Sequence, residues 1–247
     1  LIFPHDKITY DLFFVAPHVN DFDIKLKMVQ KIFPNANNLN VYIFSEYNPE
    51  DKDRFDFPTG VGKDLYGMLL VKPPPMKRLP SLNTPYAVIY IASPEHVNRT
   101  TKCFMSFVEM ICTKYHNKHE EFDIVCPTWI VNEILENKYV FGRITCNILK
   151  YYPLVRVIKK DGTIVTLKTK KKCKVNKGVE NNVLTFRGDV LPVNNKTMFS
   201  VMKYSVEDIL LTGDQSITDV FSCCPHKNVF YQTADWKIQL AQNLSKQ

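Results

Sequence analysis

The sequence predicts an α/β protein with parallel sheets. Short apolar runs typical of buried strands alternate along the chain with segments whose apolar residues recur at helical spacing. Stretches rich in glycine, proline and asparagine separate these elements. The 247 residues, of which 45% are hydrophobic, are enough for one large or two small domains with their own cores. We expect two Rossmann-like units, the second carrying a β-hairpin insertion.

The first predicted unit spans residues 1–80 and opens with a β-α-β pattern. Its predicted elements are two strands and the helix between them: Leu12–Ala16, Ile24–Phe33 and Val41–Phe44. The loop after the first strand contains His18 and Asp21. In an open α/β sheet this loop lies at the carboxyl edge, where such sheets bind ligands. We therefore expect the first unit to form one side of a site, with His18 facing it.

A proline-rich linker around Pro73–Pro75 separates this unit from a second one, residues 81–247. Strands and helices are predicted there in alternation, at Tyr86–Ala92, Thr100–Tyr115, Asp123–Cys126, Val131–Glu136, Val183–Phe186, Lys196–Tyr204, Ile209–Leu211, Ser216–Cys224, Val229–Tyr231 and Asp235–Leu244. Between them, Leu154–Ile158 and Ile164–Leu167 flank an Asp-Gly turn and predict a hairpin. We interpret residues 144–178, which contain it, as an insertion.

The segment after the strand Ile209–Leu211 indicates an anion site. Gly213 follows the strand, at a turn where glycine is able to adopt a positive φ, and a helix is predicted just beyond it. Asp214 and Ser216 are candidate caps of that helix. The unpaired backbone N–H groups at a helix start, with the helix dipole, suit a pyrophosphate. Asp219, six residues after the glycine, is able to accept two hydrogen bonds from a ribose diol.

This Gly-x-x-Ser-x-x-Asp pattern, between two strands and followed by a helix with Trp236-Lys237, resembles the nucleotide-sugar half of GT-B glycosyltransferases. The likeness is best over residues 183–247. In that family a Gly-x-x-Ser/Thr-x-x-Glu segment binds the donor, and here Asp replaces the commoner Glu. The resemblance implies a set of donor-binding residues: Arg187, Gly213, Asp214, Gln215, Ser216 and Asp219.

The same resemblance suggests a catalytic pair in the first unit. In many inverting members, a histidine after the first strand deprotonates the acceptor and an aspartate stabilises its protonated form, which implies these roles for His18 and for Asp21 or Asp23. The scheme requires no metal ion. Asp21-Phe22-Asp23 matches the Asp-x-Asp pattern of metal-dependent transferases, so the sequence leaves open whether a divalent ion binds. The predicted function is transfer of a sugar from a nucleotide-sugar, with a UDP-sugar favoured, to an unknown acceptor.

Composition and charge bear on the location of the protein and on its alternative functions. The sequence has no run of about 18 apolar residues, its first residues lack a basic region followed by an apolar stretch, and its seven cysteines form no CxxC pair. We therefore expect no membrane span, no signal peptide, free thiols and a cytoplasmic location. The net charge of +7 is concentrated in Lys168–Lys177. This run favours a solvated hairpin tip, while nucleic-acid binding remains the first alternative function. A non-catalytic α/β interaction module is the second alternative.

Overall fold

A computed structural model describes residues 10–16, 39–45, 57–58, 75–97, 99–167, 175–224 and 226–234, together with Lys27, Lys31 and Ile238. The chain divides into two compact units. One comprises Leu1–Val71 and Trp236–Gln247, and the other comprises Lys72–Asp235.

In the first unit, the described residues form a parallel sheet in the order β1-β2-β3. Its strands are β1 (Tyr10–Ala16), β2 (Leu39–Ser45) and β3 (Phe57–Pro58). Both strands predicted in this unit are confirmed, and Phe13 of β1 is the register partner of Tyr42 in β2. Lys27 and Lys31, within the predicted helix, are helical and exposed. His18 and Asp21 lie outside the described residues.

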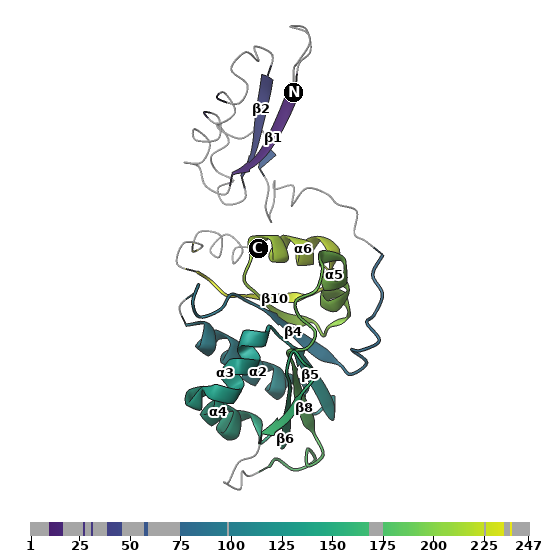
Figure 1. The fold of residues 1–247 in the computed structure, drawn as a ribbon. Helices are drawn as coiled ribbons and strands as arrows, with labels where there is room; N and C mark the ends of the chain where they lie inside the picture. Colours follow the sequence, from purple (N-terminus) through teal and green to yellow (C-terminus); the bar gives the residue numbers. More distant parts are fainter. Residues whose placement is uncertain are drawn as a thin grey trace. The chain divides into compact units, whose positions relative to one another are not determined.

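The described part of the second unit contains a seven-stranded sheet with the order β10-β9-β4-β5-β8-β6-β7 (Figure 1). Its strands are β4 (Tyr86–Tyr90), β5 (Glu121–Val125), β6 (Leu154–Ile158), β7 (Ile164–Leu167), β8 (Val183–Arg187), β9 (Asp208–Leu211) and β10 (Asn228–Tyr231). Every described pairing is parallel except that of β6 with β7. The chain is therefore an α/β protein, as the sequence predicts.

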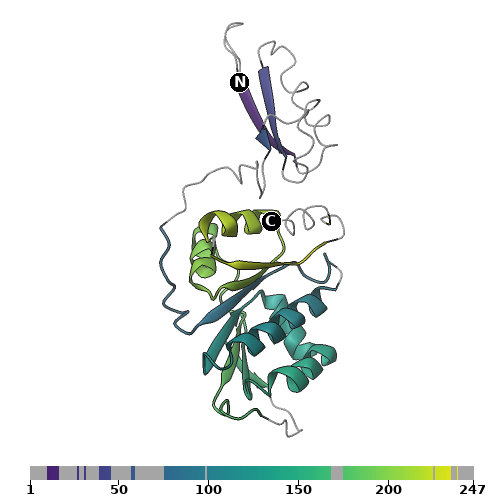
Figure 2. The same cartoon turned by 180° about the vertical axis from the view of Figure 1, so that it is seen from behind.

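Helices cover both faces of this sheet. They are α2 (Thr100–Tyr115), α3 (Thr128–Glu136), α4 (Lys138–Arg143), the π-helix η1 (Ile144–Ile148), α5 (Asn195–Tyr204) and α6 (Asp214–Cys223). Helices α2, α3 and α4 lie together on one face, whereas α5 and α6 lie on the other, beside β9 and β10 (Figures 1 and 2). The predicted bounds of α2 are correct to the residue. Helix α4 and η1 were not predicted.

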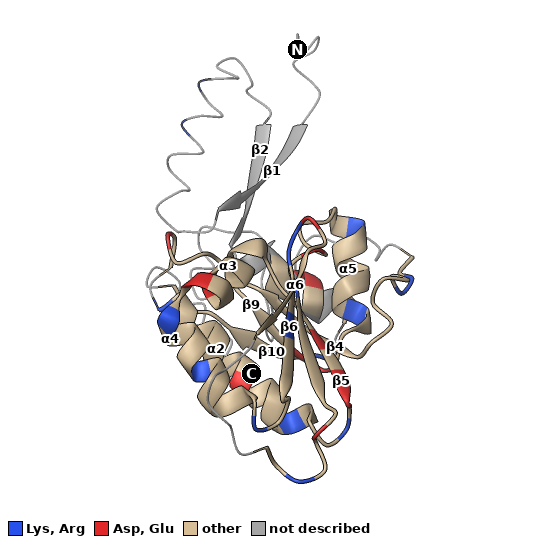
Figure 3. Ribbon diagram, turned by 60° about the horizontal axis from the view of Figure 1, so that its bottom comes forward, with Lys and Arg blue, Asp and Glu red and all other residues tan. Residues whose placement is uncertain are grey.

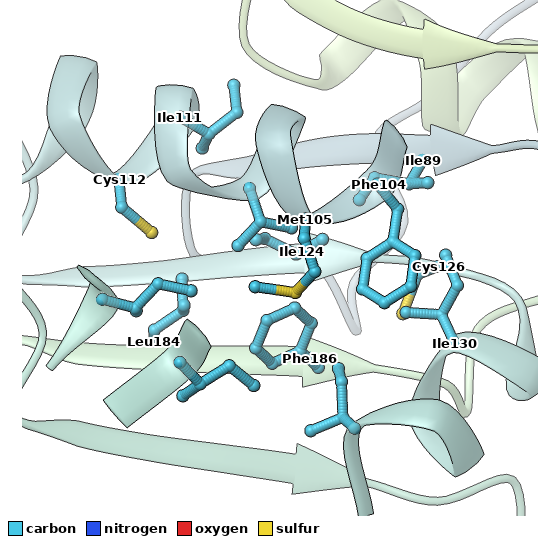
Figure 4. Close-up of a cluster of buried hydrophobic side chains, with 14 of the residues drawn as sticks. Ile89, Phe104, Met105, Ile111, Cys112, Ile124, Cys126, Ile130, Leu184 and Phe186 are labelled. Atoms are coloured by element: carbon cyan, nitrogen blue, oxygen red, sulfur yellow. The ribbon is translucent and has the colours of Figure 1, made fainter. Parts of the chain in front are cut away.

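The largest core lies beneath α2. The apolar residues of α2 recur at helical spacing and are buried, as are Ile124 of β5 and Phe186 of β8 beneath them. Figure 4 shows Phe104 and Met105 of α2 directed toward these strands. Strands buried on one face by α2 need apolar side chains at alternate positions, and β6 and β8 both show that alternation. The six described cysteines of the second unit are free thiols.

The predicted hairpin segment contributes to the main sheet. Strand β6 pairs in parallel with β8 and antiparallel with β7, so both strands extend the sheet beyond β8. The turn between them includes Gly162, whose φ of +83° suits glycine. Most of the lysine run that follows β7, residues 168–174, lies outside the described residues.

The sheet changes its direction of winding at β4. From β4 the chain passes through α2 to the neighbouring strand β5, while β9, the neighbour of β4 on its other side, leads into α6. Because α2 and α6 lie on opposite faces, their connecting loops diverge at the carboxyl ends of β4 and β9 (Figure 2). Open α/β sheets bind ligands at such a topological switch point.

Candidate functional site

A cavity of about 210 Å³ lies at the carboxyl edge of the sheet, next to the switch point. Four parts of the chain line it: the end of β4, the loop after β8, α5 and α6. The lining residues are Tyr90, Leu191, Pro192, Val193, Asn195, Met198, Phe199, Met202, Ser216 and Asp219. Most of the lining residues are apolar or aromatic, but polar and apolar atoms contribute about equally to the exposed wall. This composition is typical of small-molecule sites.

Two of the predicted donor-binding residues, Ser216 and Asp219, line this cavity together. They lie three positions apart on α6 and therefore on the same side of the helix. Ile217 and Val220, one position further on, are buried and anchor α6 to the sheet. The hydrophobic spacing of α6 thus determines which side of the helix faces the cavity.

Helix α6 begins just after Gly213, as predicted, but the structure corrects its predicted caps. The helix begins at Asp214 with Gly213 as its N-cap, so Asp214 and Ser216 lie inside the helix and are not its caps. Glycine has no side chain that could cap the helix. The hydrogen bond from the Ile217 N–H to the Gly213 carbonyl, at 3.0 Å, closes the first turn of α6. The first N–H groups of an α-helix have no partner within the helix itself, and donors of this kind bind anions.

The predicted positive φ of Gly213 is also wrong. Its φ of −172° and ψ of 134° are extended backbone that any residue adopts. A Cβ atom at Gly213 would meet only Ser216, at 3.4 Å from Oγ. The chain turns into α6 through ordinary extended geometry, so glycine is not required there by the backbone.

Arg187, another predicted donor-binding residue, is held by carboxylates. Its Nε and Nη2 each donate to one oxygen of Asp189, both at 2.8 Å, and its Nη1 donates to Asp123 at 3.2 Å and to the Ser81 carbonyl at 3.0 Å. Burial raises the pKa of Asp123 and the Arg187 charge opposes that effect, leaving the pKa above its usual value. Arg187 joins β8 to β5 and to the segment before β4. It is not among the residues that line the cavity.

Three contacts anchor the loop after β8. The Gly188 N–H donates to the Ile158 carbonyl at 3.0 Å, and the Lys160 ammonium donates to the Leu191 carbonyl at 3.0 Å. At the far end, the Asn194 side chain accepts from the Thr197 N–H at 2.9 Å and caps α5. The cavity wall formed by Leu191–Val193 is thus held from both ends.

A directed chain of hydrogen bonds closes the switch point itself. The Ala92 N–H donates to the Thr212 hydroxyl at 3.3 Å, and that hydroxyl donates to Oε1 of the Gln232 side chain. The Gln232 amide in turn donates to the Thr100 hydroxyl, which donates to the Val97 carbonyl at 2.7 Å. Gln232 and Thr100 are buried. The network ties the loop after β4 to β9 and β10.

The charges of the two helices beside the cavity are opposite. Figure 3 shows Lys and Arg positions on α5 and Asp and Glu positions on α6. From the sequence, the charged residues of α5 are Lys196 and Lys203, and those of α6 are Asp214 and Asp219. An anion at the start of α6 would therefore depend on backbone N–H groups more than on neighbouring lysines.

The last two predicted donor-binding residues are Asp214 and Gln215. Asp214 and Gln215 occupy the first turn of α6, and their side chains are not described. Tyr90, Asn195 and Phe199, which line the cavity, were not predicted as site residues. Asn195 and Phe199 lie on α5, and the pairing of β9 with β4 brings Tyr90 next to the helices that flank β9. The periodicity of the sequence does not indicate which strands and helices become neighbours.

Within the described ranges, His, Cys, Asp and Glu side chains form no group of three or more that is placed to hold a metal ion. None of the helices described is both long and apolar enough to cross a membrane. No protein-family model matches the chain, and neither a curated protein nor a solved structure matches it.

Proposed function

We propose that this chain is a glycosyltransferase whose cavity between α5, α6 and the loop after β8 binds the nucleotide part of a nucleotide-sugar. The observation that supports the proposal most is that Ser216 and Asp219, the serine and the aspartate of the Gly-x-x-Ser-x-x-Asp pattern, line one cavity at the switch point. We further propose that the two units are both Rossmann-like, as in GT-B enzymes, with the first on the acceptor side.

The size and lining of the cavity suit part of such a donor. Pockets for drug-sized ligands have volumes of about 300 to 1,000 Å³, so 210 Å³ is enough for only a portion of a nucleotide-sugar. Tyr90 and Phe199 offer aromatic surface for a base, and Asp219 places a carboxylate in the cavity wall, a group that accepts hydrogen bonds from a ribose diol. In this arrangement the diphosphate lies at the start of α6 and the sugar extends out of the cavity.

The chemistry follows from these positions. The acceptor oxygen forms a bond to the anomeric carbon as the bond from that carbon to the diphosphate breaks. Backbone N–H groups and the dipole at the start of α6 stabilise the charge that develops on the leaving diphosphate. By the resemblance, His18 takes the acceptor proton and Asp21 stabilises the resulting imidazolium. This scheme does not require a metal ion.

Calorimetry and thermal shift with UDP, GDP, CMP and their sugars test the proposal. At a hundred times its Kd, a ligand stabilises the folded state by about 2.7 kcal/mol, which raises the melting temperature measurably. Asp219→Ala is expected to remove most of this effect. Glu136→Ala is the matched control, because Glu136 is an exposed carboxylate on α3, on the opposite face of the sheet.

The binding results distinguish the proposed function from the nucleic-acid alternative. Binding of one nucleotide class that Asp219→Ala weakens and Glu136→Ala does not would support the donor site. The absence of binding to every nucleotide, with and without Mg²⁺ or Mn²⁺, would refute it. Salt-sensitive binding of single-stranded nucleic acid that is lost on neutralising Lys168–Lys177 would then favour the alternative function.

A further inference from the structure

The turn between β6 and β7 is tightly hydrogen bonded. The Lys159 N–H donates to the Thr163 carbonyl at 2.9 Å, and the Gly162 N–H donates to the Lys159 carbonyl at 3.0 Å. The Asp161 carboxylate accepts from the Thr163 N–H at 2.9 Å. Gly162 adopts a positive φ that this geometry requires. These bonds hold the backbone of Lys160 in one orientation.

From this turn, Lys160 reaches the wall of the cavity. Its Nζ lies 3.0 Å from the carbonyl oxygen of Leu191, which is buried and lines the cavity with the next two residues. The ammonium supplies a charge-assisted hydrogen bond, which is stronger than a neutral one. The strands β6 and β7 are distant in sequence from Leu191, so this contact connects two parts of the chain that the donor-type motif does not include.

We propose that Lys160 is a positioning residue of the nucleotide site, which holds the backbone of Leu191–Val193 at the distance from α6 that the base requires. This role rests on the function proposed above. Without the ammonium, the Leu191 carbonyl loses its donor, and this wall moves relative to Ser216 and Asp219. The base is affected most, because the diphosphate is bound by α6, which Lys160 does not contact in the described hydrogen bonds.

Binding to three variants tests the proposal. Lys160→Met keeps the length of the side chain and removes the charge, and it is expected to raise the Kd for the favoured nucleoside diphosphate about tenfold, the scale of one hydrogen bond to a charged group. Lys160→Arg keeps a donor and is expected to restore most of the affinity. Lys159→Met removes the same charge from the same turn and is the matched control.

A second measurement distinguishes positioning from general damage. The ratio of the Kd values for the least and most favoured bases is expected to fall in Lys160→Met, since a displaced wall discriminates less, whereas loss of stability would weaken both equally. Hydrogen exchange without ligand is expected to become faster across residues 188–194 in Lys160→Met and to stay unchanged in Lys159→Met.

The results separate failure of this inference from failure of the proposed function. If the wild type binds no nucleotide, the proposed function is wrong and the positioning role falls with it. If the wild type binds and Lys160→Met binds equally well with the same base ratio, the positioning role alone is wrong, whatever the exchange shows. Weaker binding with a reduced base ratio and rescue by Lys160→Arg supports it.

Discussion

The ammonium of Lys114 on α2 lies 2.6 Å from Oδ2 of Asp208, the first residue of β9. The same oxygen accepts from the hydroxyl of Tyr115 at 2.7 Å, and Asn228 of β10 donates to Oδ1 at 3.2 Å. One buried carboxylate therefore ties α2 to two strands at the amino edge of the sheet. Burial acts to raise the pKa of Asp208, but these hydrogen bonds together lower it below its usual value.

Because the pKa of Asp208 is lower in the folded state, the carboxylate stabilises the fold above its unfolded pKa, near 3.9. This contribution is lost as the pH falls through the folded pKa. We expect Asp208→Asn to lower the free energy of unfolding at pH 7 by about 1 to 3 kcal/mol and to flatten its dependence on pH below about 4. Urea titrations between pH 3 and pH 7, roughly, measure both effects.

Glu207→Gln is the control for that prediction. Glu207 is 67% exposed and lies 4.0 Å from Lys114, so its removal is expected to change stability by less than about 0.5 kcal/mol. An equal effect of the two substitutions would show that the buried carboxylate has no special role.

The switch-point network predicts that Thr100→Val is costly. The substitution keeps the shape and removes the hydroxyl, so the buried Gln232 amide loses its acceptor and the Val97 carbonyl loses its donor. We expect a loss of about 1 to 3 kcal/mol in the free energy of unfolding. Thr113→Val, on the exposed side of the same helix, is expected to cost less than about 0.5 kcal/mol. A cost for Thr100→Val as small as the control's would contradict the network.

Gly188→Ala is predicted to destabilise the second unit by steric conflict. A Cβ atom there would lie 2.5 Å from Cγ2 of Val131 and 3.0 Å from the Ile158 carbonyl oxygen. We expect a loss of about 1 to 3 kcal/mol in urea unfolding, partly recovered by adding Val131→Ala. A Cβ atom added at Gly142, in α4, would meet no described atom within 4 Å. Gly142→Ala is therefore expected to leave the free energy of unfolding unchanged or to raise it by up to about 1 kcal/mol.

The extended backbone at Gly213 predicts that serine is tolerated there. Its hydroxyl would cap α6 by accepting from the Ser216 N–H, so Gly213→Ser is expected to keep the melting temperature or raise it slightly. Gly162→Ser, at a φ of +83°, is expected to cost about 1 to 2 kcal/mol. Equal losses in the two variants would indicate that Gly213 needs a positive φ after all.

Most helices and strands could be predicted from the sequence because each depends on the spacing of apolar residues within its own segment. Thr100–Tyr115 has buried residues at helical intervals along its whole length, and its predicted bounds are those of α2. Strand β8 was predicted at Val183–Phe186 and spans Val183–Arg187. The order of the strands was not predictable in this way, since no local pattern states that β8 lies between β5 and β6.

The candidate site was predicted only in part for the same reason. Ser216 and Asp219 were found because a single helix presents both of them. Tyr90 and Phe199 reach the cavity through strand pairing, and Lys160 reaches Leu191 across thirty-one positions of sequence. Gly213 was misread because glycine permits a positive φ without requiring it.

The place of β8 between two earlier strands has a consequence during synthesis. Strands β5, β6 and β7 leave the ribosome before β8, yet neither β6 nor β7 pairs with β5 in the finished sheet. A nascent chain that has reached β7 is able to close the β6–β7 hairpin but has no partner strand on which to dock it. The sheet can grow in that direction only after Val183–Arg187 has emerged. Premature pairing of β6 with β5 would have to reopen to admit β8.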